Sequence, residues 1–223
     1  MTTLNLSLKA LLVPGGFTPD GYSDTVESYN QQDEEECVRK TGWQIEPQME
    51  LNQYRAFHCS LAVGAKIVLI GGYVGSSSSV SSSVEVFDLE NGAAGWAPLA
   101  SLPSGRRSHA CSFGQFNDQS KGIFVSGGFN ESPLASIVFY SLASDTWTSV
   151  GMLREARQYH SNLNLLADQT LLAVAAGWGE GATLANVEFF NGTHWSNDVQ
   201  LGIGRAFHAE VQIPAAAVSC RTF

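Results

Sequence analysis

The most regular arrangement of reactive side chains in this sequence is Arg-x-x-His, which occurs four times. The arginines are Arg55, Arg106, Arg157 and Arg205, and they follow each other at intervals of about 50 residues. A guanidinium can bind a carboxylate or phosphate through two parallel hydrogen bonds, and an imidazole can act as a general acid or base. Catalysis, however, needs one asymmetric constellation around one substrate. Four equal copies therefore indicate that the histidines pack and hydrogen-bond at turns.

Other chemical motifs are absent from the sequence. It contains no Gly-x-Ser-x-Gly, no phosphate-binding glycine–lysine loop and no His-Glu-x-x-His. The four cysteines, Cys37, Cys59, Cys111 and Cys220, lack the Cys-x-x-Cys spacing of a zinc site. Reduced thiols are favoured over disulfides, which the even number of cysteines leaves open. We predict no catalytic residue, no metal site, no cofactor and no enzyme activity.

Three further markers recur in a constant order around the arginines. The first is an apolar run that ends in two small residues, at Leu11–Gly16, Ile67–Gly72, Ile123–Gly128 and Leu171–Gly177. The second is a strand-like segment, at Val26–Tyr29, Val84–Phe87, Ile137–Tyr140 and Val187–Phe190. The third is a single tryptophan, at Trp43, Trp96, Trp147 and Trp195, which we expect to fill space between neighbouring units.

These markers divide one domain, residues 1–223, into four repeats of about 50 residues. The repeats span approximately residues 8–50, 51–103, 104–152 and 153–200. Each contains four segments of strand length, and none shows a sustained helical period. Many short strands without helices indicate an all-β fold, and a period near 50 selects a β-propeller.

The combined markers resemble the kelch repeat. The resemblance rests on the Gly-Gly doublet, the segment Val84–Asp88, Trp96 and the motif Arg106-x-x-His109. It departs from the family at Ala176, which replaces a glycine, and in a long insertion at 31–42. The resemblance implies a kelch-type β-propeller, a family in which a C-terminal strand completes the first blade.

The first and last repeats are incomplete in complementary ways. The first begins at its second strand, and the segment 205–219 supplies only a first strand. We therefore predict four blades, closed by pairing of this C-terminal strand with the N-terminal blade, because closure hides both edges. A closed ring predicts a monomer. The alternative is a piece of a larger ring, or a subunit that completes a ring with another copy.

Candidate partner-binding residues come from the loops that should line one face of the propeller. They are Arg55, Arg106, Arg107, Arg157 and Arg205, with the aromatic residues Phe17, Tyr73, Phe129 and Trp178 after the glycine doublets. The resemblance supports this choice, since arginines in comparable loops line the pocket of kelch domains that recruit acidic peptides. A purely structural role stays equally open for the four repeated arginines.

Composition limits the partners. A net charge of −9 repels phosphate backbones and anionic lipid surfaces, so we expect neither nucleic acid nor membrane as a partner. The N-terminal segment lacks the basic region of a signal peptide, which favours a cytoplasmic location; an extracellular one stays open if the chain is a piece that lacks its signal peptide. Asn-x-Ser/Thr sequons occur at Asn5, Asn130 and Asn191, with Pro133 weakening the second.

The predicted function is a non-enzymatic protein–protein interaction module. It would bind a protein or peptide, including one with acidic groups, through loops on one face of the propeller. The alternatives are an extracellular propeller that binds carbohydrate or glycoprotein, and an enzyme that uses the axial pocket. Because fold alone does not determine function, this prediction rests on the resemblance.

Overall fold

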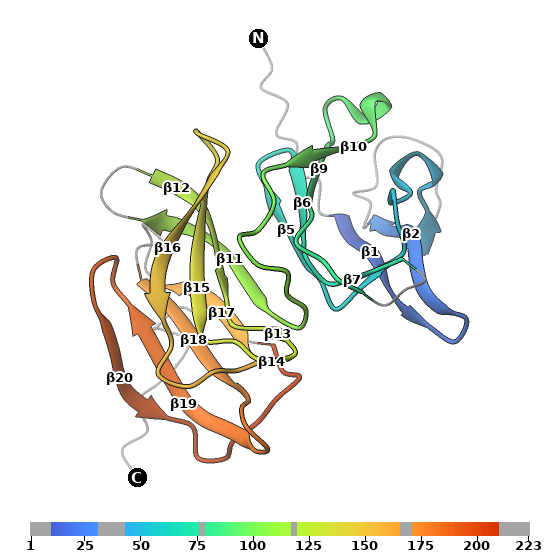
Figure 1. The fold of residues 1–223 in the computed structure, drawn as a ribbon. Coiled ribbons are helices and arrows are strands. Elements are labelled where there is room, and N and C mark those ends of the chain that lie inside the picture. The colour runs from blue at the N-terminus through green and yellow to red at the C-terminus, as the bar shows by residue number, and fades with distance from the viewer. Residues whose placement is uncertain (1–9, 31–42, 76–78, 117–119, 166–170, 210–223) are drawn as a thin grey trace.

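The computed structural model describes residues 10–30, 43–75, 79–116, 120–165 and 171–209, and these residues form an all-β protein (Figure 1). Its strands assemble into four main antiparallel sheets and two small ones. No helix in these ranges is both long and apolar enough to span a membrane. The all-β class predicted from the repeats is confirmed.

Each main sheet comes from one continuous stretch of chain. The first sheet contains β1 (Ala10–Thr18), β2 (Gly21–Asn30) and β3 (Trp43–Ile45). The second contains β5 (Cys59–Val63), β6 (Lys66–Ile70), β9 (Val84–Asp88) and β10 (Trp96–Leu99). The third contains β11 (Ala110–Phe116), β12 (Ser120–Ser126), β15 (Ser136–Ser141) and β16 (Thr146–Met152). The fourth contains β17 (Ser161–Leu165), β18 (Leu171–Trp178), β19 (Thr183–Phe190) and β20 (Trp195–Gln200).

The loops between these strands hold short elements. One small sheet joins β4 (Arg55–Ala56), β7 (Tyr73–Val74) and β8 (Ser79–Val80), and another joins β13 (Phe129–Asn130) and β14 (Ser132–Pro133). Two short 3-10 turns, η1 (Pro47–Met49) and η2 (Gly92–Ala94), complete the set. All of these elements connect main-sheet strands, so they shape the loop regions.

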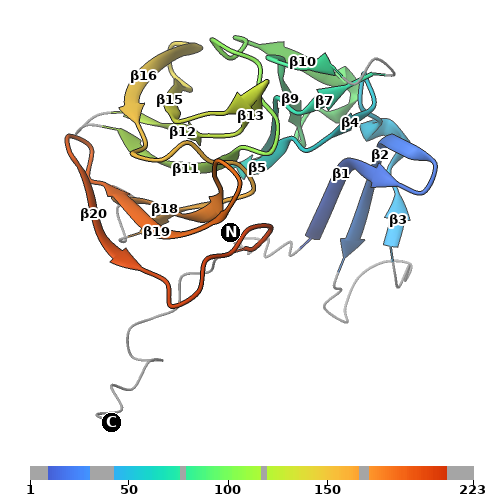
Figure 2. The same cartoon turned by 60° about the horizontal axis from the view of Figure 1, so that its bottom comes forward.

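The main sheets follow one another in an open arc (Figure 2). In the second, third and fourth sheets the strands pair in chain order, and the strand after each Arg-x-x-His forms one edge. These edge strands, β5, β11 and β17, lie side by side near the axis of the arc. Multiple antiparallel sheets in this arrangement fit a propeller.

Apolar clusters fill the spaces between consecutive sheets. Val26 of the first sheet packs with Leu69 and Trp96 of the second. Similar clusters join the second sheet to the third and the third to the fourth. The central strands are apolar on both faces, as in Ile67–Ile70, because each sheet is covered on two sides. This burial explains the uninterrupted apolar runs of the sequence.

The glycine doublets are required by close approach between neighbouring sheets. Gly71 has φ +59°, and a Cβ added there would lie 2.6 Å from the carbonyl oxygen of Arg106. Gly127 repeats this arrangement, with a Cβ 2.5 Å from the carbonyl oxygen of Arg157. Ala176 takes the same left-handed conformation, at φ 55°, at a cost of about 1–2 kcal/mol.

In the second and third sheets, the tryptophan packs against the segment that leads in from the preceding sheet. The indole Nε1 of Trp96 donates to the carbonyl of Met49 at 2.8 Å, and that of Trp147 donates to the carbonyl of Ala100 at 2.8 Å. Trp43 of the first sheet is 50% exposed. Its exposure follows from the position of the first sheet at the end of the arc.

The first sheet is incomplete in the described residues. Its edge strand β1 pairs there only with β2, and no described strand occupies the inner position that β5, β11 and β17 take elsewhere. Residues 210–219 of the predicted closing strand lie outside the described residues, as does the insertion at 31–42. Closure of the ring and the number of its blades therefore stay predictions.

Candidate functional site

Three of the four repeated arginines are buried inside the sheets that follow them. Arg55, Arg106 and Arg157 expose 1%, 1% and 0% of their surface. Arg55 donates to the carbonyl of Gly71 at 2.7 Å and to Ser83 Oγ at 2.9 Å, and it forms an ion pair with Glu85. Its guanidinium thus connects β4 with the residue that follows β6 and with β9.

Arg157 and Arg106 occupy the same place in their own sheets. Arg157 donates to the carbonyl of Ala176 at 2.9 Å and pairs with Glu188, which is fully buried. No carboxylate of the described ranges pairs with Arg106, which donates to the carbonyl of Gly127 at 3.0 Å and to Ser136 Oγ at 3.1 Å. Burial lowers the pKa of Arg106 to about 10.

For Arg55, Arg106 and Arg157, the sequence left a partner-binding role and a structural role equally open, and this burial favours the structural role. The side chains of Arg55, Arg106 and Arg157 are covered and bonded within the sheets. The signal was present in the sequence: Glu85 and Glu188 hold equal positions in their repeats, and each pairs with a buried arginine. Arg205 differs, since it is exposed and its Nε donates to the nearby carbonyl of Ile203 at 3.4 Å.

The repeated histidines pack against the preceding sheet. His160 Nε2 lies 2.8 Å from Ser126 Oγ, and His208 Nε2 lies 2.9 Å from Ser161 Oγ. Burial, with the nearby arginine, lowers the pKa of His58 to about 4 and that of His160 to about 3. The pKa of the fully buried His109 is also lowered by burial. These neutral, covered imidazoles agree with the packing role inferred from their repetition.

The residues before the repeated histidines follow one another, loop to loop, along the inside of the arc. These residues, Phe57, Ser108, Tyr159 and Phe207, all have positive φ, between 53° and 57°. The N–H of Ser108 donates to the carbonyl of Phe57 at 2.8 Å, that of Tyr159 to Ser108 at 2.9 Å, and that of Phe207 to Tyr159 at 3.0 Å. Left-handed conformations of non-glycine residues are costly and often mark functional sites. We call these four residues the axial ring.

Arg107 lies beside Ser108 and Tyr159 of the axial ring. Its guanidinium carbon is 4.8 Å from the ring centroid of Tyr73 and 4.4 Å from that of Phe129. Its Nη1 donates to Tyr159 Oη at 3.2 Å and to Ser108 Oγ at 3.4 Å. No carboxylate pairs with Arg107 among the residues that the structure describes. The guanidinium is thus held in place by aromatic rings while its charge stays uncompensated.

Further aromatic side chains surround this position. Phe57 packs edge-on against Tyr73 at 6.0 Å, and Tyr159 stacks on Phe207 at 3.9 Å. Phe57 and Phe207 are 40% and 74% exposed. We call Arg107, Tyr73, Phe129 and the axial ring the aromatic mouth. Sequence analysis missed Phe57, Tyr159 and Phe207, although an aromatic residue before three of the four repeated histidines was a usable signal.

The other two predicted aromatic residues lie beside the mouth. Phe17, which is 70% exposed, packs against Tyr22, and Tyr22 stacks on Tyr73 with 6.1 Å between centroids. Trp178 is 38% exposed and exchanges backbone hydrogen bonds with Gln158, as Phe129 does with Arg107. The structure therefore brings Tyr73, Phe129 and Arg107 together and leaves Phe17 and Trp178 at the sides.

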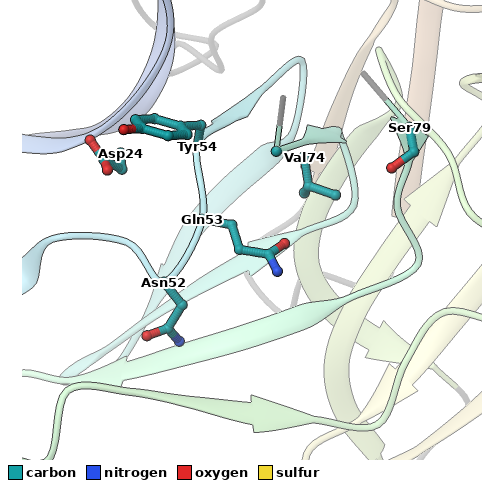
Figure 3. Close-up of a pocket in the computed structure, with 7 residues that line it drawn as sticks. Asp24, Asn52, Gln53, Tyr54, Val74 and Ser79 are labelled. Atoms are coloured by element: carbon teal, nitrogen blue, oxygen red, sulfur yellow. The ribbon is translucent and has the colours of Figure 1, made fainter. Parts of the chain in front are cut away.

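Two open pockets flank the mouth at equal places in different repeats. The larger, about 520 Å³, is lined by Asp24, Asn52, Gln53, Tyr54, Val74 and Ser79 (Figure 3). Asp24 and Tyr54 lie at one end of this pocket and Ser79 at the other (Figure 3). The second, about 390 Å³, includes Arg154, Glu155 and Glu180. Both lie between the loop before a buried arginine and the loop after a glycine doublet, so they extend the face around the mouth.

The described side chains do not converge for metal binding. Within the described ranges, no three His, Cys, Asp or Glu residues could together hold a metal ion. The buried histidines contact hydroxyl and backbone groups instead.

Comparison with known proteins agrees with the repeat structure. A model of the Kelch motif matches residues 54–102. This range contains the buried Arg55 with its ion-pair partner Glu85, the Gly71-Gly72 doublet and the buried Trp96. Equivalent features recur in the other sheets. A search of curated proteins finds no match. The motif match at residues 54–102 supports a kelch-repeat family, in agreement with the recurring architecture.

Proposed function

We propose that the aromatic mouth binds a segment of another protein and that Arg107 contacts a carboxylate of that segment. Kelch repeats in general form propellers for protein–protein interaction and are typically non-enzymatic. The observation that carries the proposal is the position of Arg107, held by Tyr73 and Phe129 with no acidic partner among the described residues.

The charge of the protein makes this position selective. The sequence has 21 acidic and 12 basic residues, so an acidic ligand is repelled by most of the surface. A guanidinium between aromatic faces is partly shielded from water, which strengthens a charge-assisted hydrogen bond. Exposed Phe57 and Phe207 add apolar area beside this charge, and aromatic residues with arginine dominate many interface centres.

Selection from a random peptide library displayed on phage tests the proposal. Wild-type protein should enrich peptides that carry aspartate or glutamate beside apolar residues. Arg107→Leu should lose these peptides, with affinity for a selected peptide lowered by roughly 10- to 100-fold, because a hydrogen bond to a charged group contributes about 1.5–3 kcal/mol. Lys66→Ala is the matched control, since Lys66 is also cationic but is the first residue of β6, at the end of the sheet away from the mouth.

Two outcomes would contradict the proposal. One is the absence of any enrichment with folded wild-type protein. The other is equal affinity of wild type and Arg107→Leu for the selected peptides, with both proteins showing the same thermal unfolding. Either outcome would leave the aromatic mouth without a role in acidic-peptide binding.

A further inference from the structure

The turn between β19 and β20 is the sequon Asn191-Gly192-Thr193, and it is shaped for chemical modification. Asn191 and Thr193 are exposed, and the backbone N–H of Asn191 donates to the carbonyl of His194 at 3.3 Å. Gly192 has φ 94°, a conformation that glycine adopts without strain. The turn projects from the edge of the fourth sheet, where a large substituent would meet solvent.

Hydrogen bonds fix the orientation of the Asn191 carboxamide. Its Oδ1 accepts from the Thr193 N–H at 3.1 Å, the Thr193 hydroxyl at 3.0 Å and the His194 N–H at 2.9 Å. Three donors around one atom identify that atom as the oxygen. The Nδ2 therefore points away from the turn, and it has no partner among the described residues.

We propose that Asn191 carries an N-linked glycan. In this modification a bond forms between Nδ2 and the anomeric carbon of an oligosaccharide. The bond from that carbon to a phosphate oxygen of the lipid diphosphate donor breaks, the diphosphate leaves with the electron pair, and Nδ2 loses one proton. An exposed Asn-x-Thr turn with a free Nδ2 is the acceptor that this chemistry needs.

A disulfide elsewhere in the chain provides independent support. Cys59 and Cys111 are bonded to each other between the neighbouring strands β5 and β11, with 6.0 Å between their Cα atoms. Disulfides form and persist in oxidising compartments, which include the one where N-glycans are attached. The sequence favoured reduced thiols, and the disulfide corrects this prediction for Cys59 and Cys111. A glycan at Asn191 would also be inconsistent with the predicted cytoplasmic location.

The other sequons serve as internal comparisons. Asn130 pairs with Ser132 in the β13–β14 turn, and Pro133 follows directly. No hydrogen bond connects Ser132 to the Asn130 carboxamide, and neighbouring Phe129 belongs to the aromatic mouth. We expect Asn130 to stay unmodified. Asn5 lies outside the described residues.

The position of Asn191 keeps a glycan away from the proposed binding face. β18 ends near the mouth, at Trp178, and β19 runs antiparallel to it. The turn after β19 consequently lies at the opposite end of the sheet. A glycan there leaves the mouth open, so modification and peptide binding are separate properties and their tests fail independently.

Mass spectrometry of the protein purified from its source cells tests the proposal. The protein is digested and treated with peptide N-glycosidase in heavy-oxygen water, which converts a glycosylated asparagine into labelled aspartate. The label is expected at Asn191 and not at Asn130. Recovery of the Asn191 peptide mainly as unmodified asparagine before enzyme treatment would overturn the proposal.

Matched variants expressed through the secretory pathway of a eukaryotic cell test the turn itself. Thr193→Ala should abolish the glycan, as should Asn191→Gln, whereas Thr193→Ser keeps the hydroxyl and should retain most of it. Alkylation of the native protein before reduction should leave Cys59 and Cys111 unlabelled. Labelling of both cysteines in protein from source cells, or a glycan that persists in Thr193→Ala, would contradict the proposal.

Discussion

Four arginines that are equivalent in the sequence have different environments in the structure. Arg55 and Arg157 form ion pairs with Glu85 and Glu188, while Arg106 bonds to Ser136 and backbone carbonyls. Breaking a buried ion pair usually costs more than its formation gains, because one charge is left uncompensated. Through these contacts, the three buried arginines connect loops to sheets. Arg107, outside the repeat pattern, is the one that reaches the proposed binding face.

The buried histidines make the stability of the protein depend on pH. His160 has a pKa of about 3 in the folded protein, against an ordinary value of 6.5, because it is buried beside Arg157. The unfolded chain therefore binds a proton below about pH 6.5 that the folded chain excludes until about pH 3. Its contribution to stability is complete above pH 6.5 and decreases as the pH falls through this window.

We expect His160→Asn to lose less stability on acidification than wild type does. Between about pH 6.5 and pH 4.5 the loss in unfolding free energy should be smaller by about 2 kcal/mol, since one pKa unit corresponds to about 1.4 kcal/mol. Urea unfolding at both pH values measures the difference. Only the change between the two pH values counts, because the substitution also removes the contact with Ser126. Equal losses in both proteins would contradict burial of a neutral His160.

At the scale of elements, the inner strands are joined by bonds that cross from sheet to sheet. The disulfide of Cys59 and Cys111 connects β5 with β11. The amide of Asn162 in β17 donates to the carbonyl of Ala110 in β11 at 3.2 Å. The axial ring adds backbone hydrogen bonds between the loops that precede these strands. The axis is thus held by covalent and polar contacts in addition to apolar packing.

Removal of the disulfide should destabilise the protein substantially. The two cysteines are 52 residues apart, and constraining a loop of that length in the unfolded chain contributes about 4 kcal/mol. We expect the Cys59→Ser/Cys111→Ser variant to unfold at lower guanidinium concentration by that free energy. Wild type measured in a reducing agent serves as the control and should match the variant. Identical unfolding of oxidised wild type and the variant would show that the bond adds no stability.

At the scale of the whole molecule, the first sheet leaves an apolar face exposed at one end of the arc. The register of the first sheet places Leu11, Tyr29 and Trp43 in one row and Val13, Glu27 and Ile45 in the next. All five apolar members of this face are 37–63% exposed. Apolar faces of this kind are normally covered in a folded protein.

Two charged residues, Glu27 and Arg205, are exposed at positions whose equivalents form buried ion pairs in other repeats. Glu27 holds in the first sheet the position that Glu85 and Glu188 hold in theirs, and it is exposed. Arg205 holds the position of Arg55 and Arg157, and it is exposed as well. Closure of the ring would bring the Glu27 carboxylate close to the Arg205 guanidinium. This is the physical argument for the predicted four-bladed, closed and monomeric propeller.

A charge exchange tests closure. Glu27→Lys alone should lower the unfolding free energy by about 3 kcal/mol, as expected for breaking a covered ion pair, and Arg205→Glu in the same chain should restore most of it. Lys66→Glu with Asp88→Lys exchanges a surface pair and should change stability little in any combination. Light scattering should find a monomer. Independent effects of the two substitutions, or association that grows with concentration, would contradict closure.

Much of the fold was predictable because it depends on local and repeated features. Apolar runs such as Ile67–Ile70 must be buried on both faces, and the doublet Gly71-Gly72 permits a conformation that other residues avoid. The repeat of these features predicted the all-β class and the strand-length segments of each repeat. The kelch resemblance, and the presence of Tyr73 and Phe129 on the face of the arginine loops, followed from the same spacing.

Which side chains are exposed was decided only by the tertiary structure. Arg106 and Arg107 are adjacent in the sequence, yet one is sealed in the third sheet and the other lies between two aromatic rings at the surface. The pairing of Cys59 with Cys111 and the alignment of the axial ring also depend on how neighbouring sheets approach each other. Spacing along the chain determines where a residue lies in its repeat, whereas burial and pairing arise from contacts between repeats, which no single repeat encodes.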